Sequence, residues 1–144
     1  MDRIPRILLV EDNPADVELA QEAFRECGIL AHFCIAADGQ EGWDLLTRCD
    51  PYAAVPLPDV ILLDLNLPRL HGRELLARIK AHPELRRVPT IVMSSSNRRG
   101  DIESCYDLLA SSYIVKPPRW DEFLAVVRSL DEYWLRTAML PEPR

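Results

Sequence analysis

Short apolar runs alternate with stretches of helical periodicity along the chain. The apolar runs are rich in Val, Ile and Leu and have the length of strands; they cover residues 7–10, 32–36, 60–63, 90–93 and 113–115. Helical periodicity follows each of them, at residues 15–27, 41–48, 72–81, 102–109 and from Trp120 onward. This alternation predicts an α/β fold with a doubly wound, five-stranded parallel sheet, five helices and right-handed crossovers.

Composition limits the possible functions. With 144 residues and 48% hydrophobic content, the chain fits one globular domain, so we expect any output domain to belong to another molecule. The net charge of −6 argues against a nucleic-acid surface. The four cysteines lack the paired spacing of a zinc site and are expected to be reduced. We find no signal peptide or membrane-length apolar run, which favours a cytoplasmic protein.

The third apolar run, residues 60–63, ends on a carboxylate, Asp64. A wholly apolar run is typical of a central parallel strand that is covered on both faces. In open α/β sheets, ligands bind outside the carboxyl ends of such strands. Asp64 is therefore a candidate for a functional group, although position alone is equally compatible with an Asp that caps the next turn.

The other strand ends favour the functional interpretation. The first strand runs into Glu11 and Asp12, the fourth into a run of three serines that begins at Ser94, and the fifth into Lys116. Three acids at one edge of a sheet repel one another unless a cation neutralises them, and Mg²⁺ suits oxygen ligands of this kind. With a metal and Lys116 present, a carboxylate can attack a phosphoryl group.

These residues form a recognisable set. Glu11-Asp12, Asp64-Leu65-Asn66-Leu67-Pro68 with Gly72 beyond it, Ser94 and Lys116-Pro117 occur in the order of a known family. Over nearly its whole length the chain resembles the receiver domain of bacterial two-component response regulators. The resemblance implies a flavodoxin-like sheet with strand order 2-1-3-4-5, in a single receiver domain over residues 1–144 with an extended C-terminal helix and tail from about residue 120.

The resemblance also implies a role for each site residue. Asp64 would accept a phosphoryl group from the phosphohistidine of a sensor histidine kinase, and Lys116 would pair with that group. The Lys116–Pro117 bond would be cis. Mg²⁺ would be held by Asp12, Asp64 and the backbone carbonyl of Asn66, with Glu11 acting through water. Ser94 and Tyr113 match the hydroxyl and aromatic positions of the family's switch, in which Ser94 moves towards the phosphoryl group and Tyr113 turns inward.

A narrower resemblance rests on Asn13-Pro14-Ala15-Asp16-Val17, a Pro-rich connector at residues 50–58 and an aromatic last helix. Together these look like the single-domain regulators that partner bacterial phytochromes. As in those relatives, kinase docking is expected at Ala15, Asp16 and Leu19 on the first helix. His71 is the histidine nearest to Asp64 in sequence, and we expect it to be a solvated loop residue.

The last helix carries more apolar residues than one helix face can bury. Phe123, Val127 and Leu130 can cover the sheet, which leaves a surplus at Val126, Tyr133, Trp134, Leu135, Met139 and Leu140. A surplus of this kind is typical of an interface. We predict a homodimer through the last helix and the neighbouring strand, with Tyr133, Trp134 and Leu135 in the interface. The alternative is a tail that folds back on its own domain.

A haloacid-dehalogenase-like phosphatase is the strongest alternative, because it also uses an Asp nucleophile, Mg²⁺, a Ser or Thr and a Lys. In that class the nucleophile precedes the acid pair, and the second residue after it is an Asp that acts as general acid and base. Here the acid pair comes first and the corresponding residue is Asn66. The chain should therefore hold its phosphoryl group as a signalling protein rather than turn over substrates as an enzyme.

Overall fold

The computed structural model describes residues 3–142 and contains a five-stranded parallel sheet with strand order β2-β1-β3-β4-β5. The strands are β1 (Arg6–Val10), β2 (His32–Ala36), β3 (Val60–Leu63), β4 (Thr90–Ser94) and β5 (Ser112–Val115). The helices are α1 (Pro14–Glu26), α2 (Gly39–Leu46), α3 (Gly72–Ala81), α4 (Arg99–Asp107) and α5 (Trp120–Leu130), with a short 3₁₀ turn η1 (Leu85–Arg87) and a π-helical segment η2 (Asp131–Thr137). The predicted fold class and strand order are confirmed.

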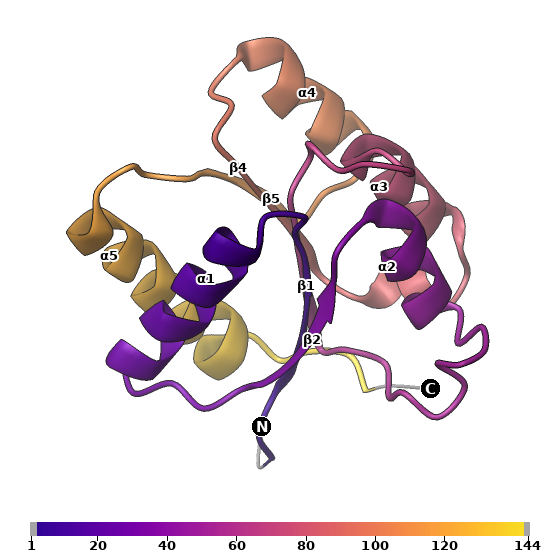
Figure 1. Ribbon diagram of the computed structural model, residues 1–144, viewed down its shortest axis with the longest axis horizontal. Coiled ribbons are helices and arrows are strands. Elements are labelled where there is room, and N and C mark those ends of the chain that lie inside the picture. The colour runs from indigo at the N-terminus through magenta and orange to yellow at the C-terminus, as the bar shows by residue number, and fades with distance from the viewer. Residues whose placement is uncertain (1–2, 143–144) are drawn as a thin grey trace.

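Helices cover both faces of the sheet (Figure 1). Successive residues of a strand point to opposite faces, so β1 contributes to two separate cores. Ile7 and Leu9 pack with α1 and α5, whereas Leu8 and Val10 pack with α2 and α3. This two-sided burial explains why β3 is apolar throughout, since all four of its residues are buried.

Side-chain caps fix where several helices begin. Asn13 caps α1 by accepting a hydrogen bond from the amide of Ala15 (2.9 Å), with Pro14 as the first helical residue. Asp38 caps α2 by accepting from the amide of Glu41 (2.8 Å). His71 caps α3, because its Nδ1 accepts from the amide of Arg73 (3.2 Å). His71 lies in the loop before α3, as expected, but its side chain is half-buried and bonded to the backbone rather than fully solvated.

The segment after α5 continues as the π-helix η2, whose wider turn changes which residues face the core. Trp134 and Leu135, with Val126 and Leu140, pack against the core beneath α1 and α5. Tyr133 and Met139 stay 55% and 95% exposed. Much of the surplus apolar surface therefore packs against its own chain. For Trp134 and Leu135 the structure shows the alternative interpretation, a tail that folds back on its own domain.

One backbone expectation was wrong. The cis peptide bond within residues 3–142 is Asp50–Pro51, in the connector before β3, and the Lys116–Pro117 bond is trans. The trans preference of an X–Pro bond is small, so the local sequence does not settle the isomer. Within the same residues, no helix is long and apolar enough to cross a membrane.

Candidate phosphoacceptor site

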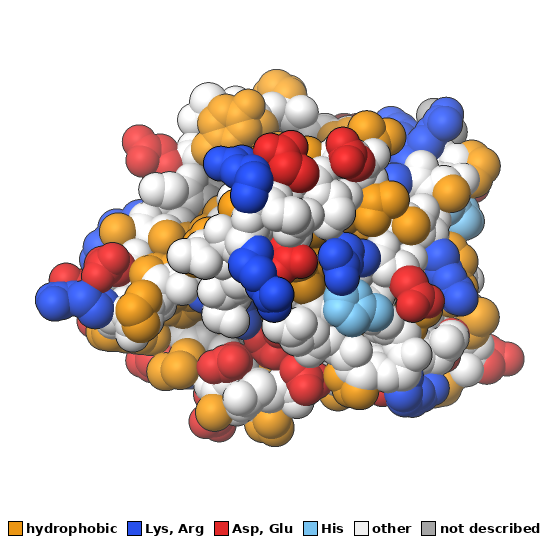
Figure 2. All heavy atoms as spheres, turned by 90° about the horizontal axis from the view of Figure 1, so that it is seen from above, with side chains coloured by type: hydrophobic (Ala, Val, Ile, Leu, Met, Phe, Trp, Pro, Cys, Tyr) orange, Lys and Arg blue, Asp and Glu red, His pale blue; other side chains and the backbone are white. Residues whose placement is uncertain are grey.

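Three carboxylates meet where β1 and β3 end. The two strands are parallel neighbours that pair Val10 with Leu63, so the residues that follow them come to the same edge. Glu11, Asp12 and Asp64 each offer an oxygen atom, and these atoms all lie within 4.8 Å of one another. Figure 2 looks onto this end of the molecule and shows acidic atoms at its centre between basic side chains. The donor set is all carboxylate oxygen, which fits a hard divalent cation such as Mg²⁺.

Lys116 brings a positive charge into this cluster. Its Nζ donates a hydrogen bond to Glu11 Oε1 (2.6 Å) and lies 3.9 Å from Asp64 Oδ2. Burial opposes the charged form of Lys116, but the hydrogen bond to Glu11 and the charge of Asp64 raise its pKa above the ordinary 10.5. Lys116 is therefore a cation at neutral pH, held within reach of the predicted acceptor.

Glu11 lies deepest of the three acids, at 4% exposure. Burial raises the pKa of Glu11, and the hydrogen bond from Lys116 opposes this effect. The Asp64 side chain is more open, at 12% exposure, so it can be approached from solvent. Of these two acids, Asp64 is therefore the one more accessible from solvent, and Glu11 lies deeper beside it.

The predicted switch residues lie on the next two strands. Ser94 ends β4 and is fully buried, and its Oγ accepts a hydrogen bond from the amide of Ser96 (3.1 Å). Tyr113 lies on β5, and its hydroxyl donates to the carbonyl oxygen of Ser96 (2.9 Å). Ser96 thus connects the two positions, a role that the sequence did not reveal because a loop serine gives no signal of its partners.

The loop after β3 is held by close backbone contacts. Leu65, Leu67 and Leu70 are buried, whereas Asn66 between them is exposed at the rim. A Cβ atom at Gly72 would lie 2.4 Å from the carbonyl oxygen of Asp64. One at Gly39 would lie 1.8 Å from the carbonyl oxygen of Leu70. Gly39 was missed by sequence reasoning, since an Asp-Gly pair indicates only a turn.

An apolar groove between α1 and α5 opens beside the site. Its volume is about 280 Å³, and Leu19, Phe24, Trp120 and Phe123 are among its lining residues. Asp64, Lys116 and Asp16 line it as well, which makes it continuous with the acidic cluster. Of the residues expected to dock a kinase, Asp16 and Leu19 line this groove, and Ala15 is exposed next to them on α1.

Comparisons with known proteins agree with this geometry. Residues 7–128 match the family described as the response regulator receiver domain. The response regulator Rcp1 of Synechocystis sp. is 38% identical over 135 residues, which cover 94% of this chain and 92% of Rcp1. The probable methanogenesis regulatory protein FilR2 of Methanothrix harundinacea is 35% identical over 137 residues, which cover 95% of this chain and 88% of FilR2.

Solved structures give the same result. The phosphorylated cyanobacterial phytochrome response regulator RcpA is 41% identical, with a TM-score of 0.92 over 97% of this chain and 100% of RcpA. The Mn²⁺-bound form of Rcp1 is 37% identical, with a TM-score of 0.89 over 96% of this chain and 99% of Rcp1. The chain therefore belongs to the response regulator receiver family.

Proposed function

We propose that this chain is a phosphoacceptor response regulator. Asp64 receives a phosphoryl group from the phosphohistidine of a sensor histidine kinase in a Mg²⁺-dependent reaction, and the chain relays the signal through a change in conformation. The observation that carries this proposal is the convergence of Glu11, Asp12, Asp64 and Lys116 at one edge of the sheet. Similarity to the cyanobacterial phytochrome response regulator RcpA supports a phytochrome as the kinase.

The proposed chemistry is a single displacement at phosphorus. A carboxylate oxygen of Asp64 attacks, the P–N bond of the phosphohistidine breaks, and the imidazole leaves with the bonding electrons. Lys116 Nζ, 3.9 Å from Asp64 Oδ2, is placed to stabilise charge on the phosphoryl oxygens. A Mg²⁺ ion held by Asp12, Asp64 and the backbone carbonyl of Asn66, with Glu11 acting through water, would neutralise further charge there.

Incubation with MgCl₂ and acetyl phosphate, followed by intact-mass measurement, tests this function. We expect one phosphoryl adduct that hydroxylamine removes, because an acyl phosphate reacts with that nucleophile. Asp64→Asn should lose the adduct, whereas Asp107→Asn, which changes an exposed acid of α4, should keep it. An adduct of equal yield in Asp64→Asn would exclude Asp64 as the acceptor.

The lifetime of the adduct and an assay with small phosphate esters together separate a signalling protein from a phosphatase. A phosphatase of the haloacid-dehalogenase type needs a general acid two residues after its nucleophile, and Asn66 cannot supply that proton. We therefore expect the adduct to persist rather than to turn over. Multiple turnover of small phosphate esters would favour the phosphatase instead. A cytoplasmic location and the lack of nucleic-acid binding stay predictions from composition.

The groove between α1 and α5 is our proposed docking surface for the kinase. Leu19 is 48% exposed at its edge, and Ala15 and Asp16 lie one turn earlier on α1, so an apolar side chain of the kinase can bind next to the acceptor. Leu19→Glu should slow transfer from the kinase and leave the reaction with acetyl phosphate unchanged. Leu30→Glu, at a 73% exposed leucine between α1 and β2, is the matched control. Equal transfer rates in both variants would exclude this surface.

The proposed switch uses Ser94 and Tyr113. A phosphoryl group adds negative charge and acceptor oxygens beside Ser94, which favours a rearranged loop after β4. Amide hydrogen exchange should then differ between the phosphorylated and unphosphorylated protein in the loop between β4 and α4. Identical exchange in the two forms would show that this loop does not respond.

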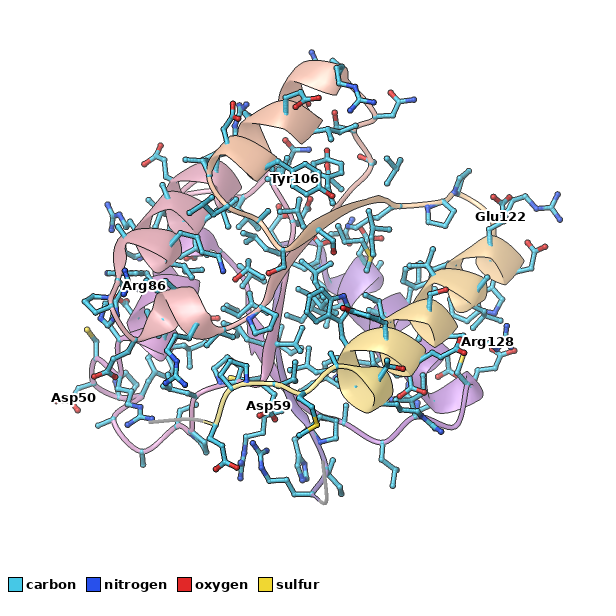
Figure 3. The ribbon with its side chains drawn as sticks, turned by 180° about the vertical axis from the view of Figure 1, so that it is seen from behind. Asp50, Asp59, Arg86, Tyr106, Glu122 and Arg128 are labelled. Atoms are coloured by element: carbon cyan, nitrogen blue, oxygen red, sulfur yellow. The ribbon has the colours of Figure 1, made fainter. Side chains whose placement is uncertain are left out.

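We also propose a homodimer through α5 and β5. Tyr133 remains 55% exposed after α5, and Val115 of β5 is 40% exposed. Tyr106 of α4 lies against β5, where its hydroxyl accepts from the amide of Tyr113 (3.1 Å; Figure 3). This contact occupies an amide of the edge strand, so side-chain packing rather than strand addition would join the copies. Sedimentation velocity of Val115→Glu and Tyr133→Glu, compared with Leu30→Glu, tests this; unchanged association in the first two would exclude the surface.

A further inference from the structure

All three polar groups of Ser96 are engaged in hydrogen bonds. Its amide donates to Ser94 Oγ (3.1 Å) and its carbonyl oxygen accepts from the Tyr113 hydroxyl (2.9 Å). Its own hydroxyl donates to Asp101 Oδ2 (2.5 Å). The residue thus connects the hydroxyl next to the proposed acceptor site, the aromatic ring on β5 and the first turn of α4.

The Asp101 carboxylate, which accepts the hydrogen bond from Ser96, is itself held by several contacts. It lies in the first turn of α4, where a negative charge is favoured by the helix dipole. Arg73 of α3 approaches it at 3.5 Å, and Arg98, the residue directly before α4, approaches it at 3.7 Å, so the carboxylate has two cationic partners. The hydrogen bond from Ser96, with these two arginines, keeps the pKa of Asp101 below its ordinary 3.8. Asp101 is therefore charged throughout the neutral range.

The bond from Ser96 to Ser94 has a consequence for the proposed reaction. A serine hydroxyl can accept hydrogen bonds while its single hydrogen stays available for donation. When Ser94 Oγ accepts from the amide of Ser96, its own O–H points elsewhere and is left for another acceptor. The neighbours Ser95 and Asn97 are exposed, so the loop depends on Ser96 for its position.

We propose that Asp101 is a positioning residue for phosphoryl transfer: it holds Ser96, and through Ser96 it orients the Ser94 hydroxyl to donate to the incoming phosphoryl group. This inference rests on the proposed function and deepens it. Asp101 touches no reacting atom and acts by holding the loop after β4 in the conformation that it has before phosphoryl transfer. A donor that is already oriented needs no ordering during the reaction, which is why its loss slows the reacting step.

A double-mutant cycle tests the connection. With acetyl phosphate and saturating Mg²⁺, Asp101→Ala should lower the maximal rate of phosphorylation about three- to tenfold, the size expected for losing one ordered contact. The KM for the donor and the affinity for Mg²⁺ should not change, since Asp12 and Asp64 are intact. Ser96→Ala should slow the reaction similarly, and the double variant should be no slower than Ser96→Ala alone.

Two further variants serve as controls. Glu103→Ala removes another acid from α4, whose carboxylate lies 3.2 Å from the Arg99 guanidinium, away from this loop. This variant should be phosphorylated at the rate of the unmodified protein. Asp101→Asn keeps an acceptor for Ser96 and should restore part of the rate. If Asp101→Ala does not fold, the phosphorylation rates of Ser96→Ala and Asp101→Asn are compared with that of Glu103→Ala instead.

The outcomes are distinct. A rate for Asp101→Ala equal to that of Glu103→Ala would overturn the inference, and so would effects of Asp101→Ala and Ser96→Ala that simply multiply. A reduced Mg²⁺ affinity in Asp101→Ala would point to general damage and also overturn it. Absence of any adduct on Asp64 in the unmodified protein would instead refute the proposed function, and the inference with it.

Discussion

Gly72 shows how a residue without a side chain supports the acidic site. The N-terminus of α3 packs so closely on the end of β3 that a Cβ atom there would lie 2.4 Å from the carbonyl oxygen of Asp64 and 2.6 Å from the Cα atom of Leu65. Both contacts are with backbone, which cannot move aside as a flexible side chain can. Any larger residue would push α3 away from Asp64 or move Asp64 itself.

Gly72→Ala should therefore destabilise the protein by about 1–3 kcal/mol, the usual cost of overpacking a tight contact. Gly100→Ala is the matched control, because a Cβ atom at Gly100 in the first turn of α4 would meet nothing within 4 Å. The control should be neutral or stabilising by up to about 1 kcal/mol, since Ala favours helix over Gly. Urea denaturation measures both; equal midpoints would show that the packing at Gly72 can relax.

Side chains at the strand ends were predictable one by one, but their partners were not. Asp64 and Lys116 stand out in the sequence because each directly follows an apolar strand. Ser96 and Asp101 do not, because their importance comes from hydrogen bonds that depend on how the loop after β4 folds. The local sequence indicates which residues can carry chemistry. Their hydrogen-bond partners cannot be predicted from it, because they depend on how close the elements lie in the folded chain.

At the scale of elements, the end of α5 departs most from its sequence pattern. The aromatic residues after Leu130 suggested one long helix with a free apolar face, but the chain widens into the π-helix η2. Trp134 and Leu135 then line the same small cavity as Ile7, Phe24 and Leu130 at the base of the core. Helical periodicity assumes 3.6 residues per turn, so it misplaces residues wherever a wider turn follows.

Trp134→Ala should lower the free energy of unfolding by about 1–3 kcal/mol. The loss is smaller than for a fully buried Trp because the side chain is only half-buried. Tyr133→Ala changes the neighbouring aromatic, which is 55% exposed, and should stay within about 0.5 kcal/mol. Thermal unfolding at a protein concentration where the chain is monomeric measures the intramolecular effect alone. Equal losses in the two variants would mean that η2 contributes no core packing.

At the scale of the whole molecule, the acidic site links metal binding to stability. The carboxylate oxygens of Glu11, Asp12 and Asp64 lie within 4.8 Å of one another, and of these acids Lys116 contacts only Glu11 and Asp64. The remaining repulsion between the three acids opposes folding unless a further cation is bound. The site needs both β1 and β3 in place, so the unfolded chain cannot offer it. Mg²⁺ should therefore bind the folded state selectively.

A Mg²⁺ concentration ten times the Kd should stabilise the fold by about 1.4 kcal/mol through mass action. Asp12→Asn should remove most of this gain, whereas Asp107→Asn should keep it. Differential scanning calorimetry with and without Mg²⁺, at constant ionic strength set with NaCl, separates specific binding from general screening. A gain of equal size in Asp12→Asn would place the ion elsewhere.

The succession of strands and helices along the chain, the apolar character of β3 and the acidic, hydroxyl and ammonium groups at the strand ends were all predictable from the amino-acid sequence. This was possible because parallel strands bring their carboxyl ends to one edge whatever the details of packing. The close approach at Gly39 and Gly72, the packing of Trp134 on the core and the hydrogen bonds from Asp101 through Ser96 to Ser94 became visible only in the folded chain. Those features depend on contacts between elements far apart in the chain, which periodicity and residue type do not encode.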